Sequence, residues 1–157
     1  MFYQAVLPVF TSFNKFLQRE TPCIHVLCDK LDSFVNKLLG KFVKISVIKD
    51  ARNESSLIDA DFQSKENQLP DSNIFVGFMT RQILQQLLND GDIADSEVTK
   101  FYAGVRTFYT KASEYVKATY PLKDDLLHAK FINFEKREEC AFDSVEYFVH
   151  RFLTCKI

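Results

Sequence analysis

A row of lysines is the pattern in this chain that best suits binding to phosphate groups. Lys30, Lys37, Lys41 and Lys44 are separated by seven, four and three residues, so a continuous α-helix would place all four along one flank. Ammonium groups in such a row neutralise nucleic-acid phosphates and release their counterions. The simpler interpretation is a solvated flank whose lysine stems cover apolar surface, because no aromatic stacking partner accompanies the lysines.

His25 and Cys28 have the spacing closest to that of a metal site. They lie three residues apart and would share a helix face, but a structural zinc site needs four ligands and no second close pair follows. Asp59 and Asp61 form an Asp-x-Asp pair in a polar segment, for which a solvated loop is the favoured interpretation. We therefore predict no metal and no other cofactor.

Residue types that enzymes use for nucleophilic attack or phosphate handling are not found here in the required context. Serines such as Ser12 and Ser113 stand outside any G-x-S-x-G motif, and no glycine-rich phosphate loop is present. No run of strands is predicted on which carboxylates would hold divalent ions for phosphodiester chemistry. The sequence therefore predicts no catalytic residue and no enzymatic activity.

Composition indicates a single helical domain over residues 1–157. The chain is 46% hydrophobic and 26% charged, which is ordinary for a soluble globular protein, and it is long enough to bury a substantial core. Sixteen Phe and six Tyr without any Trp form the unusual feature. The low numbers of glycine and proline, four of each, argue against a many-stranded sandwich or barrel.

Charge is distributed unevenly, although the formal net charge is only −1. Residues 1–52 hold eight Lys or Arg against four Asp or Glu, residues 53–97 hold two against nine, and residues 98–157 hold ten against eight. An electrostatic binding face is therefore expected on the first or the last third. Four cysteines without a secretory leader indicate reduced thiols in an intracellular protein, and no run approaches the roughly 20 apolar residues of a membrane span.

Apolar residues at helical spacing predict a mostly α fold, an irregular bundle of about six helices. The predicted helices cover residues 2–19, 22–43, 80–89, 95–120, 122–130 and 142–152. Pro8 is expected to kink the first helix or to mark a later start. Thr21 and Pro22 are expected to begin the second helix, and Pro121 to end the long one.

Two parts of the chain are predicted to be non-helical. Residues 50–72 are polar and acidic without a sustained period, so an acidic loop is expected there. Residues 45–48 are predicted to form at most a short strand or extended segment, and residues 74–78 are compatible with either strand or helix.

Several segments, in order along the chain, resemble a hAT-type transposase-like protein. They are VLPVFTSFNKFLQ (6–18), PCIH (22–25), LLGKFVK (38–44), IFVG (74–77), VRTFY (105–109), YPL (120–122) and LL (126–127). The similarity spans about residues 4–152 and consists of hydrophobic and turn residues. In that superfamily a ribonuclease-H-like catalytic fold is interrupted by a large helical insertion, with two aspartates before it and a glutamate after it.

The resemblance is to the helical insertion and not to the catalytic strands, so it assigns no catalytic residue. It implies a relic or a separated piece of a transposase that packs on a catalytic core, helps to shape a DNA channel and contributes to assembly. DNA contact through the second helix and a nuclear location, or otherwise a cytoplasmic one, are the corresponding expectations.

A free-standing helical interaction module is the alternative hypothesis. Several predicted apolar faces are wider than a monomeric bundle of this size needs. Such faces would support self-association or the binding of a partner helix. No membrane partner is predicted in either case.

Overall fold

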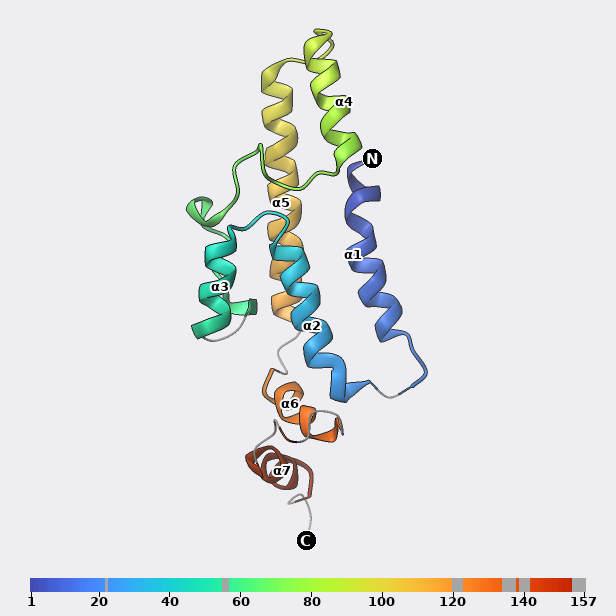
Figure 1. Cartoon of the computed structure of the whole chain (residues 1–157), viewed down its shortest axis with the longest axis vertical. Helices are drawn as coiled ribbons and strands as arrows, with labels where there is room; N and C mark the ends of the chain where they lie inside the picture. The colour runs from blue at the N-terminus through green and yellow to red at the C-terminus, as the bar shows by residue number, and fades with distance from the viewer. Residues whose placement is uncertain (22, 55–56, 120–122, 134–137, 139–141, 154–157) are drawn as a thin grey trace.

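The computed structural model is mostly helical and describes the chain except residues 22, 55–56, 120–122, 134–137, 139–141 and 154–157 (Figure 1). Its α-helices are α1 (Phe2–Leu17), α2 (Ile24–Leu39), α3 (Ile45–Glu54), α4 (Phe78–Asn89), α5 (Asp95–Thr119), α6 (Lys123–His128) and α7 (Phe142–Phe148). Short turns of helix complete the described part: η1 (Leu57–Asp59), η2 (Lys65–Asn67), η3 (Ala129–Ile132) and the π-helical η5 (Val149–Leu153). The predicted fold class is confirmed.

The helices form an elongated, irregular bundle along the long helix α5 (Figure 1). The helices α4 and α5 make an antiparallel hairpin at one end of the molecule, and α6 and α7 lie at the opposite end. Between these ends α2 contacts α1, α5 and α6. The second helix is therefore the central element of the bundle.

The core centres on α2 because its apolar residues recur at helical spacing. Phe34 of α2 stacks on Phe13 of α1 with ring centroids 4.5 Å apart and ring planes 9° apart. Burial of a side chain of this size stabilises the fold by about 1.5–3 kcal/mol. The buried residues of α2 are Leu31, Phe34, Val35, Leu38 and Leu39.

Tyr109 of α5 connects the core to the segment that precedes α4. Its side chain is fully buried, and its ring stacks on Phe42 with centroids 5.3 Å apart. The Tyr109 hydroxyl donates a hydrogen bond to the carbonyl oxygen of Phe75 at 2.7 Å. The hydroxyl is protonated at neutral pH, and burial raises the pKa of Tyr109 above its ordinary value, so the hydroxyl remains a donor in alkaline solution as well.

Helix α3 replaces the extended segment that the sequence suggested over residues 45–48. Ile45 is exposed and Ile48 is buried, and Val47 and Ala51 pack against the core beside Ile48. A run of β-branched residues this short does not distinguish strand from helix. Helix α3 takes up residues 50–54 of the expected acidic loop, and the described remainder contains the short turns η1 and η2.

The first helix begins before Pro8, although the sequence allowed Pro8 to mark a later start. Helix α1 begins at Phe2 and continues through Pro8, so the proline does not mark a later start. Pro22 and Pro121, which served as boundary markers in the sequence, lie outside the described residues.

The second helix is shorter than predicted at both ends. It begins at Ile24 and ends at Leu39, whereas the sequence suggested residues 22–43. The backbone N–H of Gly40 donates to the carbonyl oxygen of Asn36 at 2.9 Å, and the chain turns after this cap. Residues beyond Gly40 therefore leave the line of the helix.

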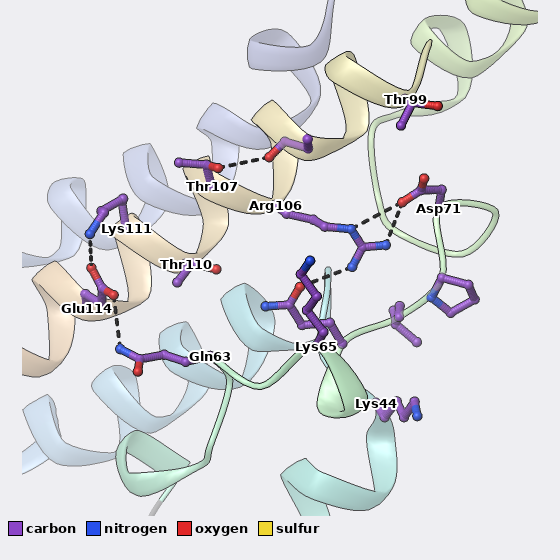
Figure 2. Close-up of a pocket in the computed structure, with 14 residues that line it drawn as sticks. Lys44, Gln63, Lys65, Asp71, Thr99, Arg106, Thr107, Thr110, Lys111 and Glu114 are labelled. Carbon is purple, nitrogen blue, oxygen red and sulfur yellow. Dashed lines mark hydrogen bonds and ion pairs between the residues drawn. The ribbon is translucent and has the colours of Figure 1, made fainter. Parts of the chain in front are cut away.

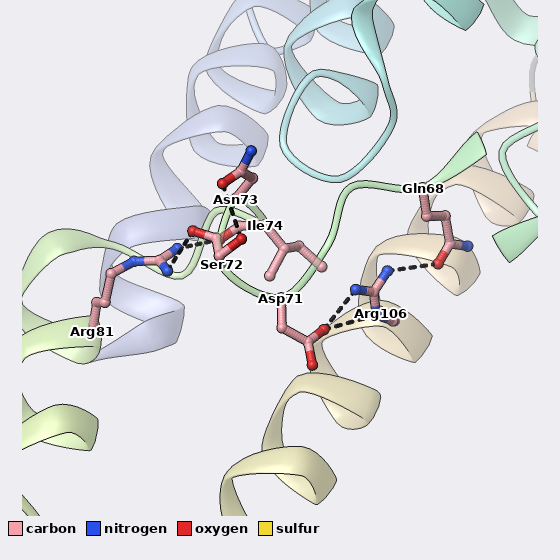
Figure 3. Close-up of polar contacts among 7 residues, drawn as sticks. All are labelled: Gln68, Asp71, Ser72, Asn73, Ile74, Arg81 and Arg106. Atoms are coloured by element: carbon pink, nitrogen blue, oxygen red, sulfur yellow. Dashed lines mark hydrogen bonds and ion pairs between the residues drawn. The ribbon is translucent and has the colours of Figure 1, made fainter. Parts of the chain in front are cut away.

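Residues 74–77 are neither strand nor helix, and α4 begins at Phe78. Arg81 stabilises this entry because its guanidinium donates to the carbonyl oxygens of Ser72 and Ile74, each at 2.7 Å (Figure 3). Gly77 has a φ of 86°, and an added Cβ there would lie 2.5 Å from the Cβ of Ala5. Glycine at this position therefore allows α1 and the start of α4 to approach closely.

Candidate nucleic-acid interface

The four lysines of the predicted row do not lie on one flank in the structure. Lys30 and Lys37 are exposed on α2 and line a groove between α1 and α2. Lys44 lines a different pocket, and its backbone N–H donates to the carbonyl oxygen of Asn67 at 2.8 Å. The row divides because α2 ends at Leu39.

Lys41 is occupied by a contact within the molecule. Its Nζ atom lies 3.5 Å from the centroid of the Phe75 ring, a distance at which an ammonium group is attracted to the π-face. Burial lowers the pKa of Lys41 below its ordinary value. We therefore assign Lys41 to the packing of the segment before α4 rather than to an external ligand.

The groove between α1 and α2 gathers three cations over an apolar floor. It has a volume of about 350 Å³ and is lined by Arg19, Lys30 and Lys37 together with apolar residues and serines. The Phe16 ring lies beneath two of the cations: its centroid is 5.5 Å from Cζ of Arg19 and 6.0 Å from Nζ of Lys30. The aromatic floor therefore helps to hold these two side chains at the groove.

The electrostatic character of the groove is uniformly positive. No Asp or Glu is among its lining residues. Arg19, Lys30 and Lys37 form no ion pair with any residue that the structure describes. Cations that converge without neutralising carboxylates raise the local concentration of anions.

The polar groups of the groove suit phosphate more than they suit bases. Ser12 on α1 and Ser33 on α2 are exposed at the groove, and their hydroxyls can donate to phosphate oxygens. Phe13 and Phe16 are each only 7% exposed and Phe34 is 5% exposed, so their faces are covered. The groove is therefore equipped to hold a nucleic-acid backbone and not to stack on bases.

Arg19 is the residue of this groove that the lysine spacing did not indicate. It follows the end of α1, and its relation to Lys30 depends on how the two helices pack. A signal is present in the first helical segment, where Ser12, Phe16 and Arg19 stand at positions i, i+4 and i+7. In the helix that the sequence predicts over residues 2–19, these positions share one face.

A larger pocket of about 860 Å³ lies between α5 and residues 63–71 (Figure 2). Arg106 at this pocket pairs with Asp71, with Nη2 2.6 Å from Oδ1, and its Nη1 donates to Oε1 of Gln68 at 3.1 Å (Figures 2 and 3). Lys111 pairs with Glu114 at 2.8 Å. Carboxylates thus neutralise two cations here, so this pocket is a poorer site for an anion than the α1–α2 groove.

Asp61, one of the candidate metal residues, has local hydrogen-bond partners in the structure. Oδ1 of Asp61 accepts hydrogen bonds from the backbone N–H groups of Gln63 and Ser64 at 3.3 and 3.2 Å, so this carboxylate shapes the turn before η2. Among the described residues no three His, Cys, Asp or Glu side chains are placed to hold a metal ion.

A serine and a histidine meet between α6 and α7. Nδ1 of His128 lies 3.2 Å from Oγ of Ser144, and the imidazole stacks on Tyr147 with centroids 4.1 Å apart. The nearby carboxylate of Asp125 accepts from the Tyr147 hydroxyl at 2.5 Å, so this carboxylate is engaged with the tyrosine. The contacts join the two helices and do not form a triad in which an acid orients the histidine.

Comparisons of this chain with family models, with curated proteins and with solved structures find no match. The resemblance to hAT-type transposases therefore rests on the quoted sequence segments. None of the described helices has both the length and the apolar character required to cross a membrane.

Proposed function

We propose that this chain is a helical nucleic-acid-binding module that contacts phosphates through the α1–α2 groove and has no catalytic centre of its own. The observation that supports the proposal most strongly is the convergence of Arg19, Lys30 and Lys37 in a groove lined by no carboxylate. Serine hydroxyls on both walls add donors for phosphate oxygens.

The proposed binding is weak and sensitive to salt. Three cations neutralise at most about three phosphates, which corresponds to a slope of about −2.7 in log affinity against log salt on duplex DNA. Affinity would then fall about 40-fold between 50 and 200 mM salt. A net charge of −1 provides no general attraction that would mask this dependence.

Membership of a hAT-like transposase lineage is part of the same proposal. The helical insertion of such a protein has no catalytic residues and lies beside the DNA. A helical chain with a phosphate-binding groove is compatible with that role. The quoted sequence segments and the helical fold class support this part. A nuclear location belongs to the proposal for the same reason.

Charge reversal within the groove tests the proposal. We expect Lys30→Glu with Lys37→Glu to lower the affinity for a fluorescently labelled DNA duplex by about tenfold or more at low salt, measured by anisotropy. The matched control, Lys44→Glu with Lys49→Glu, makes the same charge change at exposed positions outside the groove. The control is expected to change the affinity less than threefold.

Two results would overturn the proposal. One is an equal loss of affinity in both double variants, which would assign binding to net charge. The other is an absence of DNA binding by the unaltered chain at low salt. A salt-indifferent protein complex without DNA affinity would favour the alternative, a protein-interaction module.

A further inference from the structure

The positive charge of the α1–α2 groove is unevenly placed along it. Cζ of Arg19 and Nζ of Lys30 lie 5.5 and 6.0 Å from the centroid of the same Phe16 ring. Lys37 lines the same groove but stands seven residues after Lys30, which is about 10.5 Å further along the axis of α2. The groove therefore has two cations gathered at one ring and a third cation beyond them.

A nucleic acid offers two kinds of phosphate that differ in charge. A phosphodiester within a strand carries one negative charge. A phosphate monoester at a strand end carries about −1.5 to −2 at neutral pH, because its second pKa is about 6, and it has three terminal oxygens that accept hydrogen bonds. A strand end with a phosphate therefore places about two charges at one point and single charges after it.

The order of cations in the groove matches such a strand end. Two positive charges at Arg19 and Lys30 would neutralise a dianionic phosphate, and Lys37 would remain for a phosphodiester of the same strand. The planar guanidinium of Arg19 can donate two parallel hydrogen bonds to phosphate oxygens. The hydroxyls of Ser12 and Ser33, which are exposed at the groove, can donate to the remaining oxygens. No carboxylate lines the groove to repel a second negative charge.

The size and the floor of the groove also suit one terminal phosphate. Its volume of about 350 Å³ lies at the lower end of the range for small-ligand sites, about 300–1,000 Å³. Phe16 of the floor is only 7% exposed, so a base of the terminal nucleotide has no open ring face to stack on. Recognition at this groove therefore depends on the phosphate and not on the base.

We propose that the α1–α2 groove binds the phosphorylated end of a nucleic-acid strand, with the terminal monoester at Arg19 and Lys30 and the following backbone at Lys37. This inference rests on the proposed function, because it names the phosphates that the same groove prefers. Internal phosphodiesters bind there more weakly, since each brings a single charge to the paired cations. The same donors serve a 5′-phosphate and a 3′-phosphate, so the ligand is the terminal phosphate monoester.

Duplexes that differ only at their ends test the proposal. Blunt DNA duplexes of one sequence, with an internal fluorophore, carry hydroxyl groups, 5′-phosphates or 3′-phosphates at their ends. At pH 7.5 and 50 mM salt, anisotropy is expected to show at least one phosphorylated duplex binding at least fivefold more tightly than the hydroxyl-ended duplex. The tighter of the two phosphorylated duplexes identifies which end the groove takes. Equal affinity for all three duplexes would overturn the proposal.

The charge of the monoester provides a second readout. Between pH 7.5 and pH 5 the terminal phosphate gains a proton, because its second pKa is about 6, and it keeps about one negative charge. The ratio of affinities for phosphorylated and hydroxyl-ended duplexes is therefore expected to fall at least twofold as the pH is lowered. The hydroxyl-ended duplex corrects for titration of the three histidines of the chain. A ratio that is independent of pH would contradict recognition of a dianion.

Arg19→Gln assigns the preference to the paired cations. The variant is expected to bind phosphorylated ends less than twofold more tightly than hydroxyl ends. Arg52→Gln is the matched control, because Arg52 is exposed on α3 and does not line the groove, and it is expected to keep the full preference. Both arginines are exposed, so both variants are expected to fold, and circular dichroism checks this. A preference that survives Arg19→Gln, or that both variants lose equally, would overturn the assignment.

Failure of this inference is distinguishable from failure of the proposed function. Equal affinity for phosphorylated and hydroxyl-ended duplexes, together with a loss of affinity after Lys30→Glu with Lys37→Glu, would keep the phosphate groove and remove the preference for strand ends. An absence of binding to every duplex at low salt would overturn both proposals.

Discussion

Ser113 of α5 is a polar residue within apolar surroundings. Its side chain is 5% exposed, and its Oγ atom has no hydrogen-bond partner among the residues that the structure describes. Leu38, Leu57 and Phe62 line the small space beside it. A buried hydroxyl without a partner costs about 1–3 kcal/mol, so this serine is expected to lower the stability of the fold.

Ser113→Ala is expected to raise the free energy of unfolding by about 1–2 kcal/mol, because the orphaned hydroxyl is removed and little volume is lost. Urea denaturation measures the change. The matched control is Ser33→Ala at an exposed site within α2, where only helix propensity changes, by about 0.5 kcal/mol. A Ser113→Ala protein less stable than the original would contradict the assignment.

Tyr109→Phe is expected to lower the free energy of unfolding by about 1–2 kcal/mol at neutral pH, because the carbonyl oxygen of Phe75 loses its donor. A pH series of denaturation curves adds a second readout. Burial raises the pKa of Tyr109 in the folded chain, whereas the unfolded chain has the ordinary value of about 10. Above about pH 10 the unfolded state loses this proton first, so stability falls with rising pH.

The alkaline loss assigned to Tyr109 is expected to disappear in the Tyr109→Phe variant. Lys41 packs on Phe75, and burial lowers its pKa in the folded chain. Over a similar pH range the unfolded state therefore holds more protons on Lys41 than the folded state does, so this lysine makes stability rise with pH. The comparison of the two proteins isolates the tyrosine because Lys41 is present in both. Parallel pH curves for the two proteins would contradict a buried, hydrogen-bonded hydroxyl at this position.

Part of the candidate site was accessible from residue spacing and part was not. Lys30 and Lys37 are seven residues apart, which is close to two helical turns, so their common face follows from the sequence. The contribution of Arg19 depends on the packing of α1 against α2, which spacing within one helix does not determine. The separation of Lys44 depends on the end of α2 at Leu39.

The start of α4 approaches α1 closely at Gly77. Gly77 combines a φ of 86° with a position where a Cβ would lie 2.5 Å from Cβ of Ala5. Gly91, in the turn between α4 and α5, has a similar φ of 77° but open space around it. Gly77, with ψ 145°, lies near a backbone region that is essentially restricted to glycine and also meets Ala5, whereas Gly91 has a positive φ without a clash.

Gly77→Ala is expected to lower the free energy of unfolding by about 2–4 kcal/mol, because overpacking adds about 1–3 kcal/mol to backbone strain. Gly91→Ala is expected to cost about 1 kcal/mol from strain alone. Thermal or urea denaturation of both variants measures the difference. Equal losses in the two variants would contradict the close approach of α1 to the start of α4.

Secondary structure was predictable where the apolar period is long. Helix α5 keeps its pattern from Val98 to Val116, and the predicted range of 95–120 matches Asp95–Thr119 closely. Helix α3 was missed because, among its described side chains, three pack toward the core: Val47, Ile48 and Ala51. Two of these residues are β-branched, and the helix has only 10 residues, so no sustained period distinguishes it from a strand.

At the scale of the whole molecule, the positive α1–α2 groove and an acidic turn lie apart (Figure 1). The positive α1–α2 groove lies away from the turn that joins α4 to α5 (Figure 1), where Asp90, Asp92 and Asp95 are exposed. A phosphate backbone would therefore approach the groove side, while the acidic turn would stay in solvent. Residues 53–97, which contain the acidic excess of the sequence, include this turn.

The salt dependence of DNA binding tests the central claim most directly. For the unaltered chain we expect a slope of about −2.7 in log affinity against log salt on duplex DNA, and about −0.9 after Lys30→Gln with Lys37→Gln, because two phosphate contacts are lost. Lys44→Gln with Lys49→Gln is expected to keep the original slope. An unchanged slope in the groove variant, or the same decrease in both variants, would contradict the account.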